Sequence, residues 1–427
     1  MRKHLHQFLL VGMLAGMVAG ALTGWFMGKE AVTWFGWMGE FFLRCLKMLI
    51  VPLILFSMIT GVASLGDVRR LGRPGMTTIA YYLTTTAIAV LLGIILVNVI
   101  QPGVSFERPE LTAEEQAKVE ELQAERGEKS FAESLQDMAL TLVTPNLIKA
   151  MAAGNNLPLI VFAIIFGAIL TTLGEPGLRA TRVIETLNDA TIKFIRLVIL
   201  LAPIGIFGLV AAKLGATGGG AAFWGKIKQV GTYALTVIIG LVIHGVIVLP
   251  LVLRLLTRRN PVRYAGHMAR ALTTAFSTGS SAATLPVTME NVEIGAGVSK
   301  RSSRFVLPLG ATVNMDGTAL YEAVAVIFIA QSYGIALTPV QMFIIFLTAT
   351  LAAIGAAAIP EAGLVTMVLV LTSVGLPVEG IGLILAVDWF LDRCRTTVNV
   401  WGDAVGAAVV DRIGFKGLPP APGPPKA

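Results

Sequence analysis

The chain has 427 residues, of which 55% are hydrophobic and only 14% are charged. Soluble domains carry about 25% charged residues, so this composition excludes an ordinary soluble protein. The net charge of +7 does not indicate a nucleic-acid partner, because the basic residues gather in short stretches between apolar runs. Both cysteines have apolar neighbours, which argues against a disulfide framework or a cysteine metal site. We therefore expect a multi-pass membrane protein.

The first part of the chain contains uncharged runs close to the roughly 20 residues that cross a bilayer as a helix. A secretory signal would also begin with a basic stretch like Met1 to His6, but the first run is long for a signal core. We interpret it as a spanning helix. The runs predict six helices, some extended by polar flanks: Phe8–Gly28, Met48–Gly66, Pro74–Phe106, Ala150–Gly174, Leu197–Ala212 and Gln229–Leu253.

Basic residues precede the first predicted helix and follow the second, fourth and sixth. The positive-inside rule places these loops, and both termini, in the cytoplasm. The acidic segment 107–142 then lies outside, and the Pro-rich tail 413–427 is expected to be disordered. The short loops and this tail favour a location in the plasma membrane of a prokaryote, that is, its inner membrane.

Two later segments do not fit simple spans. Ala271–Met289 carries STGSSAATLP at its centre, and residues 340–378 carry AAIGAAAIPEAG. Irregular backbone at membrane depth is tolerated only where protein or cavity water satisfies it. We interpret each segment as a helical hairpin that enters the membrane and turns back, with a kinked spanning helix as the alternative. Paired broken segments of this kind indicate the binding site of a transporter.

The final predicted helix, residues 379–412, carries polar groups at spacings of 4, 3, 4 and 4. They share one helix face. Charges near the bilayer centre cost about 2.5–3.5 kcal/mol each, so they must be paired, hydrated or bound to a ligand. An arginine can hold a carboxylate bidentately, and an Asp one turn away suits an ammonium group. The face therefore indicates binding of an acidic amino acid, and a self-neutralising ion-pair network is the alternative. The residues of this face are Asp388, Asp392, Arg395, Asn399 and Asp403.

The preceding helix carries GATVNMDGTALYEA. Asn314, Asp316 and Thr318 are two residues apart and would point in opposing directions in a regular helix, and Gly310 and Gly317 are poor helix residues. We predict that the helix unwinds here. Unwound carbonyls together with Asn and Asp oxygens suit Na⁺, while a plain kink with capped polar groups is the alternative.

Other polar residues within the predicted spans have ordinary structural explanations. The threonines of YYLTTTA in the third helix can bond back to helix carbonyls. His244 in the sixth helix is expected to be a satisfied core residue rather than a proton relay. Taken without further information, neither feature indicates a site.

Four motifs near the C-terminus occur in a fixed order: SSAATLPVTM, NMDGTALYEA, AAIGAAAIPEAGLVTM and DWFLDRCRTTVNVWGD. With them the chain resembles the dicarboxylate/amino-acid:cation symporter family, most of all its excitatory amino-acid transporter branch. The resemblance is strongest from Tyr264 to Val410 and covers nearly the whole chain. It implies an all-α membrane protein with eight transmembrane helices, two re-entrant helical hairpins and inverted repeats. It further implies an elevator-type transporter that assembles as a homotrimer.

The resemblance also implies a division of the chain. Helices 1, 2, 4 and 5 would form a fixed scaffold from residues 1–72 and 143–216. Helix 3, residues 73–106, would join helix 6, both hairpins, helix 7 and helix 8, residues 217–412, in a mobile transport domain. The loop 107–142 and the tail 413–427 belong to neither.

Carried over to this sequence, the resemblance implies that Arg395 holds the side-chain carboxylate of the substrate with help from Thr318. Asp392 would bind the amino group and Asn399 the α-carboxylate. The resemblance assigns further substrate contacts to Thr396 and to the two hairpin tips. The first tip consists of Gly279, Ser280 and Ser281. The second tip, which would act as a gate, consists of Ile359, Pro360, Glu361, Ala362 and Gly363.

Three sodium sites are implied in the same way, and the coupling ions take the place of any cofactor. The first uses Gly310, Asn314, Asn399 and Asp403. The second uses backbone oxygens of Thr312, Ala353, Ile354 and Ala356. The third uses Tyr82, Thr85, Thr86, Asn314 and Asp316.

Three positions follow or depart from branches of the family. Glu322 matches the carboxylate implicated in proton cotransport and potassium counter-transport in the excitatory branch. Arg393 could fill the space beside Gly279, where archaeal aspartate transporters carry an arginine. Glu361 places a charge at the gate, where several relatives have a neutral residue.

Rival functions have weaker support. A C4-dicarboxylate carrier would have no use for Asp392, and neutral amino-acid exchangers lack a match for Arg395. An intramembrane aspartyl protease would need GxGD, which is broken at Val400. A pure anion channel is a further rival, since a chloride leak is only a side activity in the excitatory branch. We therefore expect a transporter rather than an enzyme, and the choice between glutamate and aspartate stays open.

Overall fold

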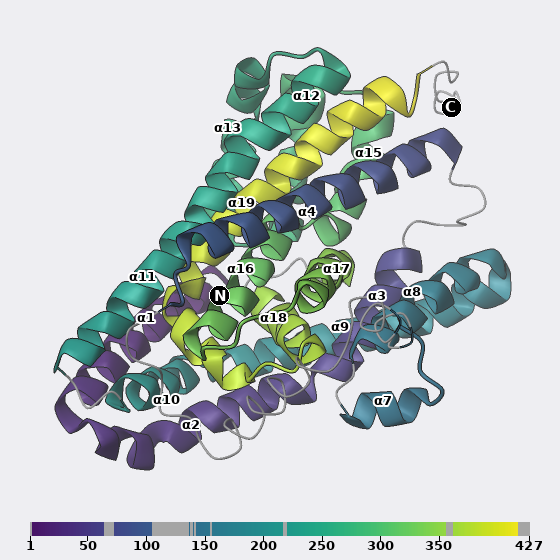
Figure 1. Ribbon diagram of the computed structural model, residues 1–427. Coiled ribbons are helices and arrows are strands. Elements are labelled where there is room, and N and C mark those ends of the chain that lie inside the picture. Colours follow the sequence, from purple (N-terminus) through teal and green to yellow (C-terminus); the bar gives the residue numbers. More distant parts are fainter. Residues whose placement is uncertain are drawn as a thin grey trace.

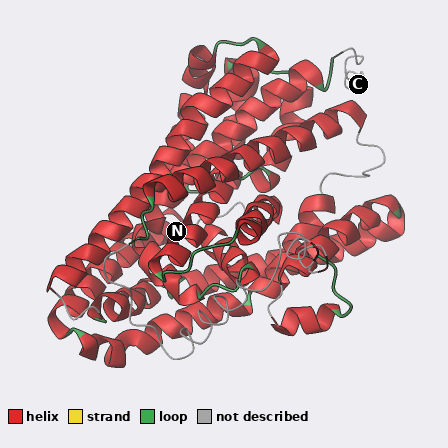
Figure 2. Ribbon diagram, viewed as in Figure 1, coloured by secondary structure: helices red, strands yellow, loops and turns green. Residues whose placement is uncertain are grey.

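The computed structural model describes residues 2–63, 72–104, 136, 140, 142–153, 156–216, 220–355 and 362–416. All regular structure in these residues is helical (Figure 2). Most of the predicted acidic loop, the Pro-rich tail from residue 417 and the centre of the second predicted hairpin, residues 356–361, lie outside the described residues.

Most helices of the N-terminal half of the chain pack in two groups. Helix α1 (Arg2–Met27) turns at Gly28 (φ 54°) into α2 (Lys29–Met48), which leads into α3 (Ile50–Ala63). Helix α3 packs against α8 and α9, whereas α1 and α2 pack against α10 (Figure 1). The remaining bounds in this part are α7 (Leu147–Ala153), α8 (Asn156–Thr172), α9 (Glu175–Ile199) and α10 (Ala202–Gly215).

The contact between α1 and α10 depends on glycine. A Cβ atom on Gly16 would lie 2.3 Å from the carbonyl oxygen of Pro203, and one on Gly20 would lie 2.7 Å from that of Phe207. Small residues at four-residue spacing let two helix backbones approach closely, as they do in membranes. The stripe on α1 consists of Gly12, Gly16, Gly20 and Gly24.

A second set of helices runs side by side in the other half of the molecule (Figure 1). Helix α4 (Gly72–Ile100) and α11 (Gly220–Ile243) both contact α19 (Ile381–Ile413). Helix α11 continues through a π-helical turn, His244–Val248, into α12 (Leu249–Thr257).

Each segment predicted to be a hairpin contains two helices that contact each other. Helix α13 (Pro261–Thr278) contacts α14 (Ser281–Glu290), and α17 (Pro339–Gly355) contacts α18 (Ala362–Ser373). The first pair turns at Gly279, whose φ of 61° favours glycine, and Ser280 caps α14. A π turn (Asn291–Gly295) follows α14, and a short 3₁₀ turn (Val378–Gly380) precedes α19.

The predicted break in the seventh helix is confirmed. Helix α15 (Lys300–Val313) ends at Asn314, and α16 (Asp316–Ser332) starts two residues later. The intervening backbone is not helical, with φ,ψ of −99°, 89° at Asn314 and −120°, 55° at Met315. This broken helix forms the centre of the molecule, because the most apolar window of Lys300–Ser332 is entirely buried.

Several helices have the length and composition of membrane spans. Within the described ranges, α9 and α10 meet at a bend of 55°, and together they would count as one span. Helix α19 is also long enough at 33 residues, but it carries the charged face predicted above. The chain is therefore a multi-pass membrane protein. The unbent spans are Lys29–Ala63, Gly72–Ile100, Ile227–Thr257 and Lys300–Ser332.

The glycine stripe gives a first test. We expect Gly16→Ala to lower the melting temperature in detergent, because overpacking against backbone typically costs about 1–3 kcal/mol. Gly231→Ala is the matched control, because no atom lies within 4 Å of a Cβ at Gly231 in α11. Equal melting temperatures of the two variants, measured by fluorescence-detected gel filtration after heating, would contradict the close contact.

Candidate functional site

Arg395 lies at the centre of the site, and its side chain is only 1% exposed in the middle of α19. Its Nη2 donates to Oδ1 of Asp392 at 2.8 Å, and its Nη1 lies 3.0 Å from Oδ1 of Asp388. The guanidinium also lies over the ring of Tyr321, with Cζ 3.8 Å from the centroid. Two carboxylates and one aromatic face therefore hold a single arginine.

The hydrogen-bonding capacity of this arginine is only partly used. Nε and Nη1 have no hydrogen-bond partner among the described residues, and the close approach to Asp388 lacks hydrogen-bond alignment. A Cβ on Gly363 would lie 3.0 Å from Nη1, so the start of α18 reaches the guanidinium only because this residue is glycine. A buried arginine with unused donors can bind a further carboxylate.

Asn399 joins α19 to the start of α16. Its Oδ1 accepts from the backbone N–H of Gly317 at 2.8 Å, and its Nδ2 donates to Oγ1 of Thr318 at 3.2 Å. A Cβ on Gly317 would lie 2.8 Å from the carbonyl oxygen of Arg395, so glycine permits the close approach of the two helices. Thr396 is also buried on α19. The structure thus brings Arg395, Asp392, Asn399 and Thr318 together, while their roles toward a substrate stay a prediction.

Residues of the first predicted sodium set lie next to one another. Asn314 donates through Nδ2 to Oδ1 of Asp403 at 2.9 Å, and its own Oδ1 is buried without a partner. A Cβ on Gly310 would lie 2.4 Å from Oδ1 of Asp403 and 2.5 Å from the hydroxyl of Tyr82. The carboxylate, amide and hydroxyl oxygens gathered here are hard ligands of the kind that suits Na⁺.

The third predicted set converges on Asp316. Thr86 donates to Oδ1 at 2.7 Å, and Thr85 lies 3.3 Å from the same oxygen. The Tyr82 hydroxyl instead donates to the carbonyl of Val306 at 2.8 Å. Helix α4 therefore brings both threonines against Asp316, and their role in a sodium site stays a prediction.

The second predicted set is less complete. Helix α15, which carries Thr312, packs on α17, which carries Ala353 and Ile354. The Thr312 hydroxyl donates within its own helix to Leu309 at 3.1 Å, and no hydrogen bond described here links it to α17. Ala356 lies outside the described residues. This set stays a prediction.

The two hairpin tips differ in how far they are described. Ser280 accepts through its side chain from the N–H of Ala283 at 3.2 Å, and both Ser280 and Ser281 are buried where α14 contacts α19. In the second tip, α18 begins at Ala362, and Ile359, Pro360 and Glu361 lie outside the described residues. The role of these three residues as a gate stays a prediction.

Two predicted special positions lie near the site. Thr366 of α18 donates to Oε1 of the fully buried Glu322, whose Oε2 has no described partner. Arg393 donates to the carbonyl of Trp389 at 2.6 Å and lies over that ring. Its side chain therefore lies along α19, and the described contacts of Arg393 give no support to a position beside Gly279.

Comparison with known proteins decides the family. Residues 9–413 match the sodium:dicarboxylate symporter family. The chain belongs to this family. It is 42% identical to mouse excitatory amino acid transporter 3, over 90% of this chain and 80% of that protein. It is 39% identical to excitatory amino acid transporter 1 of Ambystoma tigrinum, over 92% of this chain and 80% of that protein. Mouse excitatory amino acid transporter 2 is 42% identical, over 87% and 72%.

Sequence reasoning missed one neighbour of the site. His244 was expected to be a satisfied core residue, and it is fully buried, but the contact of its Nε2 with Oδ2 of Asp316 at 2.9 Å was not predicted. Its Nδ1 has no described partner. The π turn that starts at His244 sets the direction of the ring, and no periodic pattern in the sequence marks that turn.

Sequence reasoning also left Asp388 and Tyr321 without a role. Asp388 was placed on the polar face of the last helix, but its approach to Arg395 was not predicted. Tyr321 stands one turn after Thr318 in α16, so the helical period could have placed it on the same side as that residue. Both residues hold the guanidinium in position.

Arg395→Lys tests this arrangement. A lysine cannot contact both carboxylates and the ring, and breaking a buried pair typically costs about 3–5 kcal/mol. We expect a clear fall in melting temperature in detergent. Arg393→Lys, two residues away and half-buried, should melt like the wild type. A large fall for both variants would mean that α19 tolerates no change, rather than that Arg395 is special.

Proposed function

We propose that the protein is a secondary active transporter that carries L-glutamate or L-aspartate in symport with Na⁺. The observation that carries this proposal is the buried Arg395, which has unused donors and a carboxylate, Asp392, one turn away. The family is named for sodium-coupled dicarboxylate symport, and the relatives are named excitatory amino acid transporters. The fit of charge and the family assignment agree.

An acidic amino acid fits this site by exchanging partners. Arg395 donates to Asp392 at 2.8 Å in the structure. One carboxylate of the substrate would pair with the guanidinium of Arg395, and the ammonium group of the substrate would pair with Asp392. The substrate's other carboxylate would then meet Asn399 and the tip at Ser280 and Ser281. A dicarboxylate without an amino group would leave Asp392 buried and unpaired, which is unfavourable.

Sodium would supply the positive charge that the rest of the site lacks. Asp316 and Asp403 are buried, and their described neighbours are hydroxyl, amide and imidazole groups rather than lysine or arginine. Cations bound at the first and third sets would neutralise them. Na⁺ binding at the second set would depend on the tip that closes over the substrate.

The remaining architecture follows the family. We infer eight spans with re-entrant hairpins at α13–α14 and α17–α18, cytoplasmic termini and a homotrimer. A scaffold of α1–α3 and α7–α10 would hold a transport domain of α4 and α11–α19 that moves as an elevator. The packing of α1 with α10 and of α3 with α8 and α9 on one side, and of α4, α11, α13 and α16 with α19 on the other, supports this division.

Uptake into vesicles tests the proposal. Purified protein in liposomes should accumulate labelled L-aspartate when an inward Na⁺ gradient is imposed, and should not do so without Na⁺. Arg395→Cys should abolish aspartate uptake, because the guanidinium is lost, and could admit neutral amino acids. Arg393→Cys is the control and should transport. Uptake driven by protons alone, or aspartate uptake retained in Arg395→Cys, would show that the cation sites or the role of Arg395 are misassigned.

Glu322 carries a separate hypothesis on coupling. We propose that this carboxylate takes part in proton cotransport and potassium counter-transport, because it is buried, holds one hydrogen bond from Thr366 and is near the gate helix α18. Transport by the wild type should require internal K⁺. Glu322→Gln should remove that requirement, whereas Glu185→Gln on the exposed side of α9 should not. Wild-type transport that ignores K⁺ would sink the hypothesis.

A further inference from the structure

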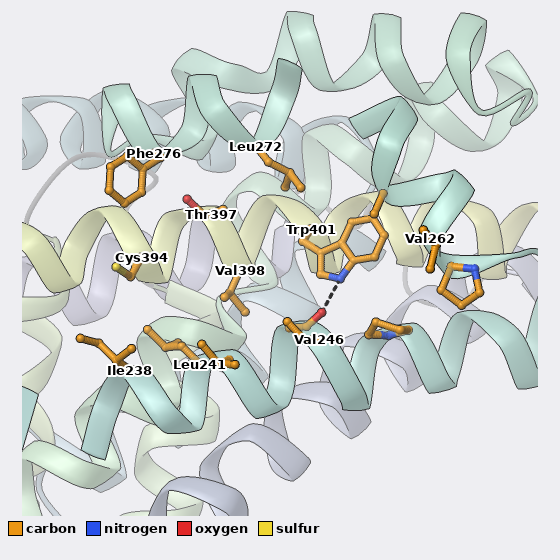
Figure 3. Close-up of a pocket in the computed structure, with 15 residues that line it drawn as sticks. Ile238, Leu241, Val246, Val262, Leu272, Phe276, Cys394, Thr397, Val398 and Trp401 are labelled. Atoms are coloured by element: carbon orange, nitrogen blue, oxygen red, sulfur yellow. Dashed lines mark hydrogen bonds between the residues drawn. The ribbon is translucent and has the colours of Figure 1, made fainter. Parts of the chain in front are cut away.

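A deep apolar groove lies on the side of α19 away from the substrate site. Its volume is about 540 Å³, within the roughly 300–1,000 Å³ usual for small-molecule sites. It runs from Ile238 and Phe276 at one end, past Leu272 and Trp401, to Val262 at the other (Figure 3). Helices α11, α12 and α13 form its rims and α19 its floor. The proposed transport function does not use this groove.

The π turn of α11 shapes the groove. The indole N–H of Trp401 donates to the carbonyl of Gly245 at 2.9 Å, so this polar pair is satisfied and the groove offers an almost wholly apolar lining (Figure 3). Val246, in the same turn, is 67% exposed. The lining therefore needs an apolar occupant, and the absence of further hydrogen-bonding groups along it disfavours a peptide.

The surroundings of the groove identify the chemistry of that occupant. The α11–α12 segment, Ile227–Thr257, has the composition of a membrane span, yet only 33% of its most apolar window is buried inside the molecule. Large apolar side chains on its outer side are exposed, among them Val242, Val246 and Leu251. A groove that opens on such a face meets the hydrocarbon of the bilayer.

One end of the groove is positively charged. Arg254, Arg258 and Arg263 are exposed around the turn between α12 and α13, next to the lining residues Pro261 and Val262. Arg263 lies in the first turn of α13, where a helix dipole disfavours a cation, so helix stability does not explain it. Basic residues gathered at the end of a span attract anionic lipid head groups. The neighbouring Arg259 is instead engaged by the carbonyl of Ala296 and by Asp411, so the exposed arginines form the basic rim.

We propose that this groove binds an anionic phospholipid, with one acyl chain between α11 and α13 and the phosphate among the arginines. The chain would contact Cys394, Thr397 and Trp401, which lie on the face of α19 opposite to Arg395 and Asn399. The lipid would thus support the helix that carries the substrate site from behind. The apolar groove matches the acyl chain of a phospholipid, and the basic rim matches its anionic head group.

The test is binding rather than transport, so it does not depend on the proposed function. Detergent-purified protein is mixed with phosphatidylglycerol, with phosphatidylcholine of the same chains, or with glycerol 3-phosphate. Bound lipid is counted by native mass spectrometry, and the melting temperature is recorded. We expect one retained phosphatidylglycerol for each chain, a rise of several degrees in melting temperature, and little effect of the other two compounds.

Three variants locate the lipid. Ala265→Phe fills the groove, and Arg254→Gln/Arg263→Gln removes head-group charge; each should lose at least tenfold in phosphatidylglycerol affinity. The control Arg179→Gln/Arg182→Gln removes the same charge from exposed positions on α9 and should bind as the wild type does. Equal binding of phosphatidylcholine, an equal effect of glycerol 3-phosphate, or an equal loss in the control pair would overturn the proposal. If Ala265→Phe does not fold, the comparison of Arg254→Gln/Arg263→Gln with its control pair still tests the proposal.

Discussion

The ion pair between Arg395 and its two carboxylates is the interaction on which the site depends. A guanidinium that is 1% exposed cannot stay charged in a helix bundle unless other groups compensate it, and here Asp392, Asp388 and the ring of Tyr321 do so. Two carboxylates beside one arginine leave negative charge in excess when all three are ionised. That excess is a physical reason for a substrate with an ammonium group. It also explains why an acidic amino acid, and not a simple dicarboxylate, suits the pocket.

The break between α15 and α16 gives the cation side of the site its geometry. Because the helix stops at Asn314 and restarts at Asp316, side chains that would diverge on a regular helix meet Asp403, Thr86 and His244 instead. Such a break exposes backbone groups and is tolerated at membrane depth only when protein surrounds it. Complete burial of the apolar window of Lys300–Ser332 satisfies this condition. In the proposed arrangement Asn399 would belong to both the substrate end and the cation end, with Asp403 one turn further along the same helix, which would tie substrate binding to ion binding.

Much of this could be predicted from the sequence, for identifiable reasons. A charge inside an apolar run is conspicuous, and the spacing from Asp388 to Asp403 follows the helical period, so the polar face of α19 and the unwound segment were found directly. The threonines of α4 were found only through the family resemblance, because hydroxyls in a span usually bond backward. Searching for uncharged runs overlooked α2 and α9, whose charges lie along amphipathic helices. His244 was expected to be a satisfied core residue and is one, but its partner Asp316 could not be foreseen, because no local signal in the sequence marks the π turn that starts there.

That π turn connects the two faces of the transport helices. At one end it directs the His244 ring to Asp316, and one residue later it presents the Gly245 carbonyl to Trp401 in the outer groove. Trp401 lies two residues before Asp403 on α19, so a shift of the indole would move the backbone that positions this proposed cation ligand. Packed interiors transmit displacements because they have few voids to absorb them. A lipid chain that fills the groove would restrict both helices at this crossing, so the bilayer face and the ion site would not be mechanically independent.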